Sequence, residues 1–220
     1  WLYLDNVQVV SNGLPMQVKL MLEGPYDAGL GRMRDDLRAA SLIPTTEPFT
    51  ALGFTQVGGG GGETVLPAVF TTTGDNAIVD WVLVELRSAV TPSTIVATRS
   101  ALVQRDGDVV GTNAISPVLF NSPAGSYYVA VRHRNHLGCM TAAPLALTGA
   151  ATSVDLTLAG TATYGTGARK DLGGIQGLWT GNVTLDTELL YTGAGNDRDP
   201  ILQAIGGVVP TNSIAGYRME

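Results

Sequence analysis

The sequence predicts an all-β protein, an immunoglobulin-like or related β-sandwich with a short helical insertion and a small C-terminal appendage that resembles a calcium loop. The composition supports this class, because the 220 residues include 28 glycines and only 15% are charged, which is typical of a turn-rich β protein. Short apolar runs separated by turn signals recur along the chain, and only one segment has a helical period.

The predicted strands are the apolar runs with alternating or continuous β character, at 1–10, 16–24, 77–87, 94–104, 126–134 and 151–159. The run "AIVDWVLVELR" is apolar on both sides along its middle, so we expect a central strand that is covered on both faces. One face holds Val79, Trp81, Leu83, Glu85 and Arg87, and the other holds Asp80, Val82, Val84 and Leu86.

The helical insertion is predicted at 31–43, where Met33, Leu37 and Ala40 share one helical face and Pro44 provides a stop. The composition changes again at "YGTGARKDLGG", which begins at Tyr164. We therefore expect two units along the chain.

The predicted units are a β-sandwich domain at 1–163 and an appendage at 164–220 that is truncated at its end. The glycine run at 58–62 is expected to form a flexible loop. It lacks the Lys and Ser/Thr of a phosphate-binding loop, so it predicts no nucleotide site.

Charge and cysteine content exclude several classes. The formal net charge of −6 and the lack of a basic cluster disfavour nucleic-acid binding. No run reaches the roughly 18 apolar residues of a membrane helix, so membrane insertion is not expected. A single cysteine excludes an intramolecular disulfide. The first residue, Trp1, and the final "GYRME" both predict cut ends in a longer chain.

The stretch "YYVAVRHRNHLGCM" at 127–140 holds both histidines, His133 and His136, and the only cysteine, Cys139. A zinc site would need a fourth ligand and normally pairs its cysteines. A nucleophilic cysteine would need a base and an orienting acid. We expect instead that the histidines bind loop backbone and that Cys139 is a small buried apolar residue.

Paired carboxylates mark a turn at "VQRDGDVVG", where Asp106, Gly107 and Asp108 form an Asp-Gly hairpin signal between two β runs. Calcium ligation by the two aspartates is the alternative. Because no third carboxylate lies nearby in the sequence, we expect a hairpin.

The C-terminal segment at 181–207 carries the strongest metal signal. Asn182, Thr184 and Asp186 occupy alternate positions, the spacing at which oxygen ligands of an EF-type loop face a calcium ion, and Asp197 follows. These four residues are the predicted metal ligands, with calcium as the expected ion.

A plain turn followed by a helix is the alternative for this segment. The run "DPILQAIGG" would begin a short helix with Asp199 as its N-cap and Pro200 at its first position. Both interpretations stay open at this point.

Several stretches together resemble a module at the C-terminal end of large secreted surface proteins of Bacteroidetes and relatives, of hemagglutinin-like or dockerin-like type. The stretches that carry the resemblance are "LEGPYD" (22–27), "GLGRMRDDLR…LIPTTEPF" (29–49), "NAIVDWVLVELR" (76–87), "TRSALVQRDGDVV" (98–110), "SYYVAVRHRNHLGCMTA" (126–142) and "NDRDPILQAIGG" (196–207). The resemblance implies an extracellular location, export by the type IX route, and a C-terminal repeat with calcium-type loops at Asn182, Thr184, Asp186 and Asp197. It implies no enzymatic activity.

The first functional hypothesis is a secreted, non-enzymatic protein of the cell surface, either an adhesin module or a subunit of a self-assembling filament or sheath. Open sheet edges favour pairing between chains. The run at 1–10 is a candidate for a donated strand, although an ordinary first strand is the simpler expectation.

The second hypothesis is a carbohydrate-binding module of a larger secreted protein. Its candidate platforms are the aromatic residues Trp1, Trp81, Trp179, Tyr26, Tyr127, Tyr128, Tyr164, Tyr191 and Tyr217. Trp81 is expected in the core and Trp179 at a partly exposed junction. A third hypothesis, an enzyme, would use His133, His136 and Asp80, but no spacing predicts that they converge.

Overall fold

The computed structural model describes residues 13–204, 207 and 211. It is mostly β, as predicted, and its main sheet has nine strands. The predicted strand at 1–10 lies outside the described residues. In chain order the strands of this sheet are β1 (Leu14–Lys19), β4 (Ile78–Ser88), β5 (Ile95–Gln104), β6 (Asp108–Val110), β7 (Val118–Phe120), β8 (Gly125–Arg132), β9 (Cys139–Met140), β10 (Leu145–Leu147) and β11 (Thr152–Asp155).

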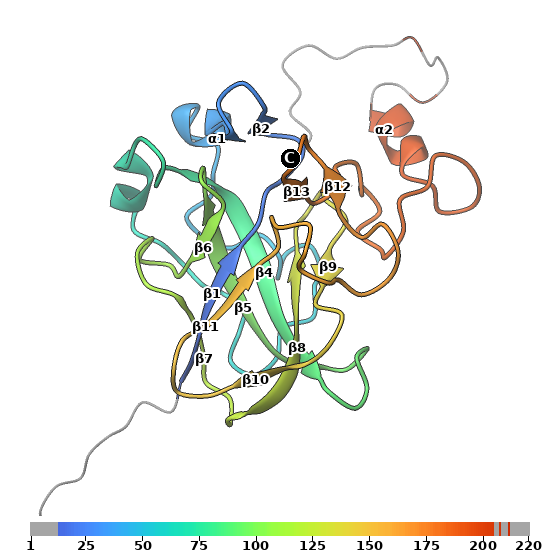
Figure 1. The fold of residues 1–220 in the computed structure, drawn as a ribbon. Coiled ribbons are helices and arrows are strands. Elements are labelled where there is room, and N and C mark those ends of the chain that lie inside the picture. Colours follow the sequence, from blue (N-terminus) through green and yellow to red (C-terminus); the bar gives the residue numbers. More distant parts are fainter. Residues whose placement is uncertain (1–12, 205–206, 208–210, 212–220) are drawn as a thin grey trace, which may run out of the picture.

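The strands pair in the order β10-β8-β4-β5-β6-β1-β11, with β7 beside β1 and β9 beside β8. All of these pairs are antiparallel except β1 with β11. The sheet folds back on itself, so that β1 and β11 lie over β4, β5 and β8 (Figure 1). The Asp-Gly hairpin is confirmed, because it joins β5 to β6 in register.

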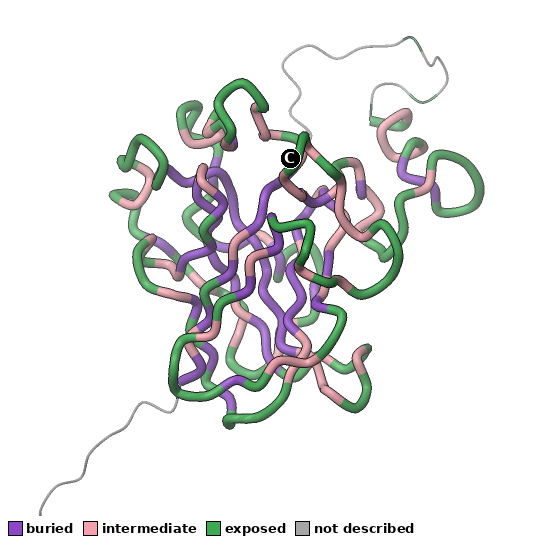
Figure 2. The backbone as a smooth tube through the Cα atoms, in the orientation of Figure 1, coloured by how far each residue is buried: buried purple, intermediate pink, exposed green. Residues whose placement is uncertain are grey.

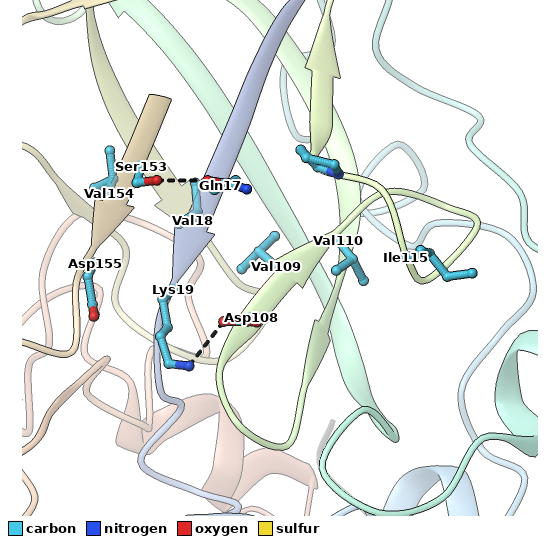
Figure 3. A pocket seen from close by; sticks show the side chains of 11 residues that line it. Gln17, Val18, Lys19, Asp108, Val109, Val110, Ile115, Ser153, Val154 and Asp155 are labelled. Atoms are coloured by element: carbon cyan, nitrogen blue, oxygen red, sulfur yellow. Dashed lines mark hydrogen bonds and ion pairs between the residues drawn. The ribbon is translucent and has the colours of Figure 1, made fainter. Parts of the chain in front are cut away.

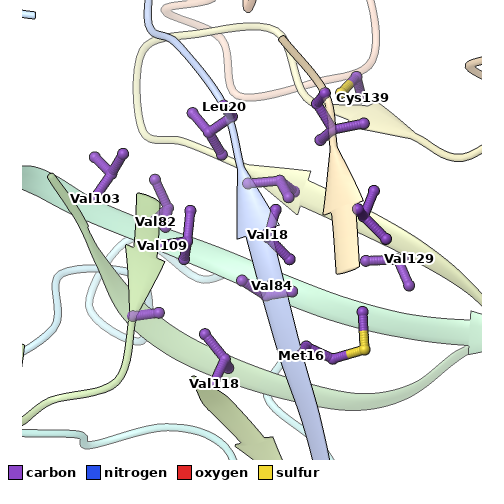
Figure 4. Packing of buried hydrophobic residues seen from close by; sticks show 14 of the residues in the cluster. Met16, Val18, Leu20, Val82, Val84, Val103, Val109, Val118, Val129 and Cys139 are labelled. Atoms are coloured by element: carbon purple, nitrogen blue, oxygen red, sulfur yellow. The ribbon is translucent and has the colours of Figure 1, made fainter. Parts of the chain in front are cut away.

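The main hydrophobic core fills the space between the two parts of the folded sheet. Met16 and Val18 of β1 belong to the same buried cluster as Val82 and Val84 of β4 (Figure 4). The buried backbone runs through the middle of the molecule and the exposed backbone lies in the loops (Figure 2). Each large apolar side chain buried in this way stabilises the fold by about 1.5–3 kcal/mol.

Strand β4 is covered on both faces, as predicted. On its second face Trp81 and Leu83 belong to a separate cluster with Phe49 and Phe54. The predicted faces are wrong at the beginning of the strand, where Val79 belongs to the main core.

The cause is a β-bulge in β4. Gln104 and Val103 are neighbours on β5, but their partners on β4 are Ile78 and Asp80, so Val79 between them is an extra residue. A bulge shifts the alternation of faces and turns one side chain out of the regular pattern.

The predicted helix at 31–43 is much shorter in the structure. It is α1 (Asp36–Ala39), four residues long. Met33 does not lie on a helix but in β3 (Arg32–Met33), which forms a hairpin with β2 (Tyr26–Asp27). Gly31, at a φ of 64°, makes the turn between them.

Loops cover the outer face of β4 and β5. They include the 3₁₀ helix η1 (Pro67–Thr71) and the glycine run at 58–62. A Cβ on Gly60 would lie 2.2 Å from the hydroxyl oxygen of Thr98, and one on Gly58 would lie 2.6 Å from the Cβ of Ala97. The glycines therefore allow this loop to pack directly on β5.

The C-terminal part contains the hairpin β12 (Lys170–Asp171) with β13 (Gln176–Gly177), and the helix α2 (Arg198–Ala204). Leu178 is 1% exposed and belongs to the main core. The segment just after residue 163 thus packs with the large sheet.

Helix α2 is where the sequence predicted a helix, but its cap differs. The side-chain oxygen of Asn196 accepts the backbone N–H of Asp199 at 2.9 Å, so Asn196 provides the cap and Asp199 lies inside the helix. None of the helices described here is long and apolar enough to cross a bilayer.

Candidate functional site

A buried polar cluster lies where β8 ends and β4 begins, and we call it the histidine network. It comprises Asp80, His133, Arg134 and His136, which are between 3% and 9% exposed. Strand β8 ends at Arg132, and the following turn directs the next side chains toward the bulge of β4. The structure thus brings together the three residues of the enzyme hypothesis.

Asp80 is the acceptor at the centre of the network. Its Oδ2 lies 3.0 Å from Nε2 of His133 and accepts a hydrogen bond from a guanidinium nitrogen of Arg134 at 2.8 Å. Its Oδ1 accepts the backbone N–H of Trp81 at 2.7 Å. The buried carboxylate is therefore paired with a charge and bound at both oxygens, the arrangement that a buried charge requires.

The backbone fixes where the protons of both imidazoles lie. Nε2 of His136 accepts the N–H of Gly24 at 3.1 Å, so the proton of the neutral ring is on Nδ1. Nδ1 of His133 accepts the N–H of Asn135 at 3.3 Å, so its proton is on Nε2 and faces Asp80.

The two rings also contact each other. Their Nδ1 atoms are 3.1 Å apart, and Nδ1 of His136 lies 2.7 Å from the side-chain oxygen of Asn135. Each of the four ring nitrogens therefore has a partner within the protein.

Burial lowers the pKa of His136 well below its ordinary value, and the nearby His133 and Arg134 act in the same direction. The imidazole is therefore neutral at physiological pH. A cavity of about 320 Å³ adjoins the network and is lined in part by Asp80, His133 and His136 themselves, together with Pro25 and Leu37. A general base needs a nitrogen within reach of the substrate proton, and here Gly24 occupies Nε2 of His136.

Cys139 is separate from this chemistry. It is 5% exposed and lies in the main core (Figure 4). Burial raises the pKa of its thiol to about 12, so it is an unreactive apolar side chain. Across the part of the chain that the structure describes, no group of three or more His, Cys, Asp or Glu side chains could hold a metal ion.

Of the predicted calcium ligands, the structure brings Asn182, Thr184 and Asp197 together. Oδ1 of Asp197 accepts the N–H of Val183 at 2.8 Å, and the N–H and hydroxyl of Thr184 at 3.1 and 3.0 Å. Its Oδ2 accepts the N–H of Leu190 at 2.9 Å. Burial acts to raise the pKa of Asp197, but these hydrogen bonds outweigh it and hold the pKa below its usual value.

The fourth predicted ligand, Asp186, faces elsewhere. Its Oδ1 accepts the N–H of Glu188 at 2.8 Å, and its backbone carbonyl accepts the side-chain N–H of Asn182 at 3.0 Å. Asp197 therefore acts as a clamp that closes the loop through backbone hydrogen bonds. Calcium binding by this loop stays a prediction.

The outer face of β1, β6 and β11 carries a pocket of about 390 Å³ (Figure 3). Its polar side chains bind one another, Lys19 with Asp108 at 3.0 Å and Ser153 with Gln17 at 2.8 Å. Asp108 is thus an ion-pair partner on the surface, and Asp106 accepts the N–H of Asp108 to close the hairpin.

A larger groove of about 480 Å³ lies over the C-terminal part of β8, where Ala130 and Arg132 line it, and we call it the Tyr164 groove. Strands, the loop between β4 and β5, and the loop after Leu185 all contribute to it. Its lining includes Arg87, Pro92, Ser93, Ala130, Arg132, Gly138, Met140, Tyr164, Thr166, Asp186 and Thr187.

The groove combines an exposed aromatic ring with two guanidinium groups. Tyr164 is 56% exposed and packs edge-on against Tyr128, with ring centroids 6.5 Å apart. Arg132 donates to the carbonyl of Leu185 at 2.8 Å, and its guanidinium carbon lies 4.5 Å from the ring centroid of Phe54.

Arg87, the second guanidinium, is paired with the fully buried Glu85, whose Oε2 lies 2.7 Å from Nε and 2.5 Å from a terminal nitrogen. Burial lowers the pKa of Arg132, with Glu85 acting in the opposite direction and Arg87 in the same direction. The charges of the groove are thus close enough to influence each other.

The tryptophans are poorer platforms than this tyrosine. Trp81 is fully buried, as predicted. Trp179 is half-buried, with the ammonium of Lys170 lying 5.2 Å from its ring centroid. Trp1 and Tyr217 lie outside the described residues.

No family model, no curated protein and no solved structure matches this chain.

Proposed function

We propose that this chain is a non-enzymatic module of a secreted cell-surface protein, built as an immunoglobulin-like or related β-sandwich, that acts as an adhesin or as a self-assembling structural subunit. The observation that supports it best is the closed histidine network. Its ring nitrogens bind Asp80, Asn135, Gly24 and each other, so the histidines already have partners within the protein although they line a cavity.

Self-association would use the edges of the main sheet. Strands β10 and β11 are the two ends of the strand order. The side chains of Ala146 and Ser153, one on each edge strand, are exposed. Neither strand carries the Lys or Pro with which many proteins block an edge, and each can therefore accept a strand from a second chain.

Sedimentation and electron microscopy of the purified chain test this proposal. We expect concentration-dependent assembly that Ala146→Lys weakens by about tenfold or more, because a charge on an edge strand opposes sheet extension. The matched control is Val90→Lys, which adds the same charge at a loop position that is 91% exposed. Monomers at all concentrations, or equal loss in both variants, would rule out edge pairing.

Calcium enters the proposal through the predicted ligands Asn182, Thr184, Asp186 and Asp197. The same assembly measurement, made with calcium and with a chelator, shows whether the ion contributes. Loss of assembly in chelator would support calcium as a clamp, and unchanged assembly would oppose it.

Carbohydrate binding is the second candidate, and the Tyr164 groove favours it. An exposed aromatic ring beside hydrogen-bonding side chains suits a ligand that has both apolar and polar faces. Such a module would attach a larger secreted protein to a glycan.

A further inference from the structure

We propose that the Tyr164 groove binds one uncharged pyranose unit of a glycan, with Tyr164 as the stacking platform and Arg132 and Asp186 as the hydrogen-bonding pair. This inference rests on the second candidate function, for which it names the site and the class of sugar. Three features of the groove support the proposal: its shape, the polar groups that are available to bind a ligand, and its balance of charge.

The groove is hollow because a small residue of β8, Ala130, lies between two large ones. Tyr128, Ala130 and Arg132 alternate along one face of β8, and Ala130 is only 3% exposed. The methyl side chain leaves a hollow between the larger neighbours. The volume of about 480 Å³ lies within the range of small-ligand sites, and Tyr164 forms one wall.

Tyr164 is positioned like a platform rather than a core residue. The edge-on contact with Tyr128 at an interplanar angle of 88° fixes its orientation, while 56% of the residue stays exposed. The C–H face of a pyranose ring can therefore stack on it without any rearrangement of the core.

The groove offers both a hydrogen-bond donor and a hydrogen-bond acceptor to the hydroxyl groups of a sugar. Arg132 carries five N–H donors and uses one of its terminal nitrogens for Leu185. Asp186 accepts Glu188 N–H at Oδ1, which leaves its Oδ2 without a hydrogen-bond partner among the described residues. Because Arg132 binds the carbonyl of the residue just before Asp186, the donor and the acceptor lie near each other and can serve a pair of neighbouring sugar hydroxyls, each of which donates and accepts.

The backbone around Asp186 is held in an unusual conformation. Leu185 has a φ of 62°, in the left-handed region that costs a non-glycine residue of order 1–3 kcal/mol. Arg132 binds its carbonyl from one side, and Asp197 binds the amides of Val183 and Thr184 from the other. The predicted calcium residue Asp197 thus acts as a positioning residue for the acceptor in the groove.

The balance of charged side chains at the groove favours an uncharged sugar. The positive Arg87 and Arg132 are balanced by the negative Glu85 and Asp186, and Glu85 is already paired with Arg87. Because these four charges sum to zero, the groove has no excess of positive charge to favour an acidic sugar, and a uronic or sialic acid would bring its carboxylate close to that of Asp186.

Calorimetric titration of the full chain, with saturation-transfer NMR as a second readout, tests the proposal. The probes are the methyl glycosides of glucose, galactose, mannose and N-acetylglucosamine, and the charged comparators are methyl glucuronide and N-acetylneuraminic acid. We expect at least one neutral glycoside to bind at concentrations up to about 10 mM, and the charged sugars to bind about tenfold more weakly or not at all.

Two variants locate the site. Tyr164→Ala is expected to weaken binding about tenfold or more, and Asp186→Asn about fivefold. Tyr191→Ala, which removes a tyrosine that is 75% exposed outside the groove, is the control and should leave affinity unchanged. Circular dichroism establishes that each variant is folded.

Either failure is informative. If no neutral glycoside binds, or if Tyr164→Ala binds as tightly as wild type, the proposal is overturned. If only the charged sugars bind, the second candidate function survives and the choice of an uncharged sugar is wrong. Edge pairing is measured separately through Ala146→Lys, so neither result affects the other.

Discussion

The histidine network and the Tyr164 groove both depend on β8, but they differ in what their polar groups are bound to. In the network, Asp80 and both imidazoles are buried and bind partners inside the protein. In the groove, Tyr164 is more than half exposed and Arg132 binds one carbonyl. Residues of the types usual in catalysis thus have their polar groups bound within the protein, whereas the groove leaves a tyrosine more than half exposed.

The largest loss of stability is expected for a substitution that disrupts the histidine network. Asp80→Ala removes the carboxylate that Arg134 and His133 bind, and it should lower the free energy of unfolding by about 3–5 kcal/mol, because one member of a buried, hydrogen-bonded ion pair is lost. Urea denaturation measures this. The control is Asp108→Ala, which removes an exposed pair with Lys19 and should cost at most about 1 kcal/mol. Similar costs for both variants would contradict the assignment.

A smaller loss of stability is expected when Asp197, which closes the loop through backbone hydrogen bonds, is replaced. Asp197→Ala leaves the amides of Val183, Thr184 and Leu190 without their acceptor, and the expected cost is about 2 kcal/mol. Hydrogen exchange should accelerate at these three amides, while strand β4 stays protected. Faster exchange throughout the molecule would show that the loop is not a separate unit.

The stability of the histidine network should also depend on pH. Because burial lowers the pKa of His136, the unfolded chain binds a proton below about pH 6.5 that the folded chain does not bind. Stability should therefore fall as the pH falls below about 6.5, by up to about 1.4 kcal/mol per pH unit for this group. Above that pH the contribution of His136 is constant.

The control for this effect is His136→Gln, which removes the titrating group. The difference in unfolding free energy between wild type and variant, measured from pH 7.5 to 5, isolates His136 from the neighbouring Asp80, His133 and Arg134, and from Arg34 and Asp36 at the adjoining cavity. A difference that does not change with pH would show that the imidazole is accessible to protons in the folded state.

The smallest effect on stability is expected in the groove. Tyr164→Ala should change the free energy of unfolding by less than about 0.5 kcal/mol, as is usual for an exposed position, although it abolishes the proposed platform. A loss above about 2 kcal/mol would place Tyr164 in the core and remove the contrast between the two regions.

Sequence reasoning predicted the parts of the fold that depend on local pattern. The strand at 77–87, the burial of Trp81 and the Asp-Gly hairpin follow from periodicity and turn chemistry, and the structure confirms them. The helix was overestimated, because the pattern around Met33 suits a helical face, while Gly31 turns the chain into a hairpin.

The two sites depend on contacts that no local pattern encodes. Gly24, Asp80 and His136 are far apart in the sequence, and the bulge at Val79 that directs Asp80 toward them has no signal in the sequence. The groove joins Tyr164 and Asp186 to a strand more than 30 residues away. Only the small Ala130 between two large neighbours could have been noticed in advance, and its meaning depends on the loops that cover it.

Long-range ¹⁵N–¹H NMR of the imidazoles tests whether the ring nitrogens of the histidine network are bound within the protein as described. The chain contains only two histidines, so the spectrum resolves each ring. We predict a proton on Nδ1 of His136 and on Nε2 of His133 at pH 7, with His136 still neutral well below pH 6.5. The opposite tautomers, or a His136 ring that titrates near pH 6.5, would contradict the account and return these residues to consideration as a catalytic site.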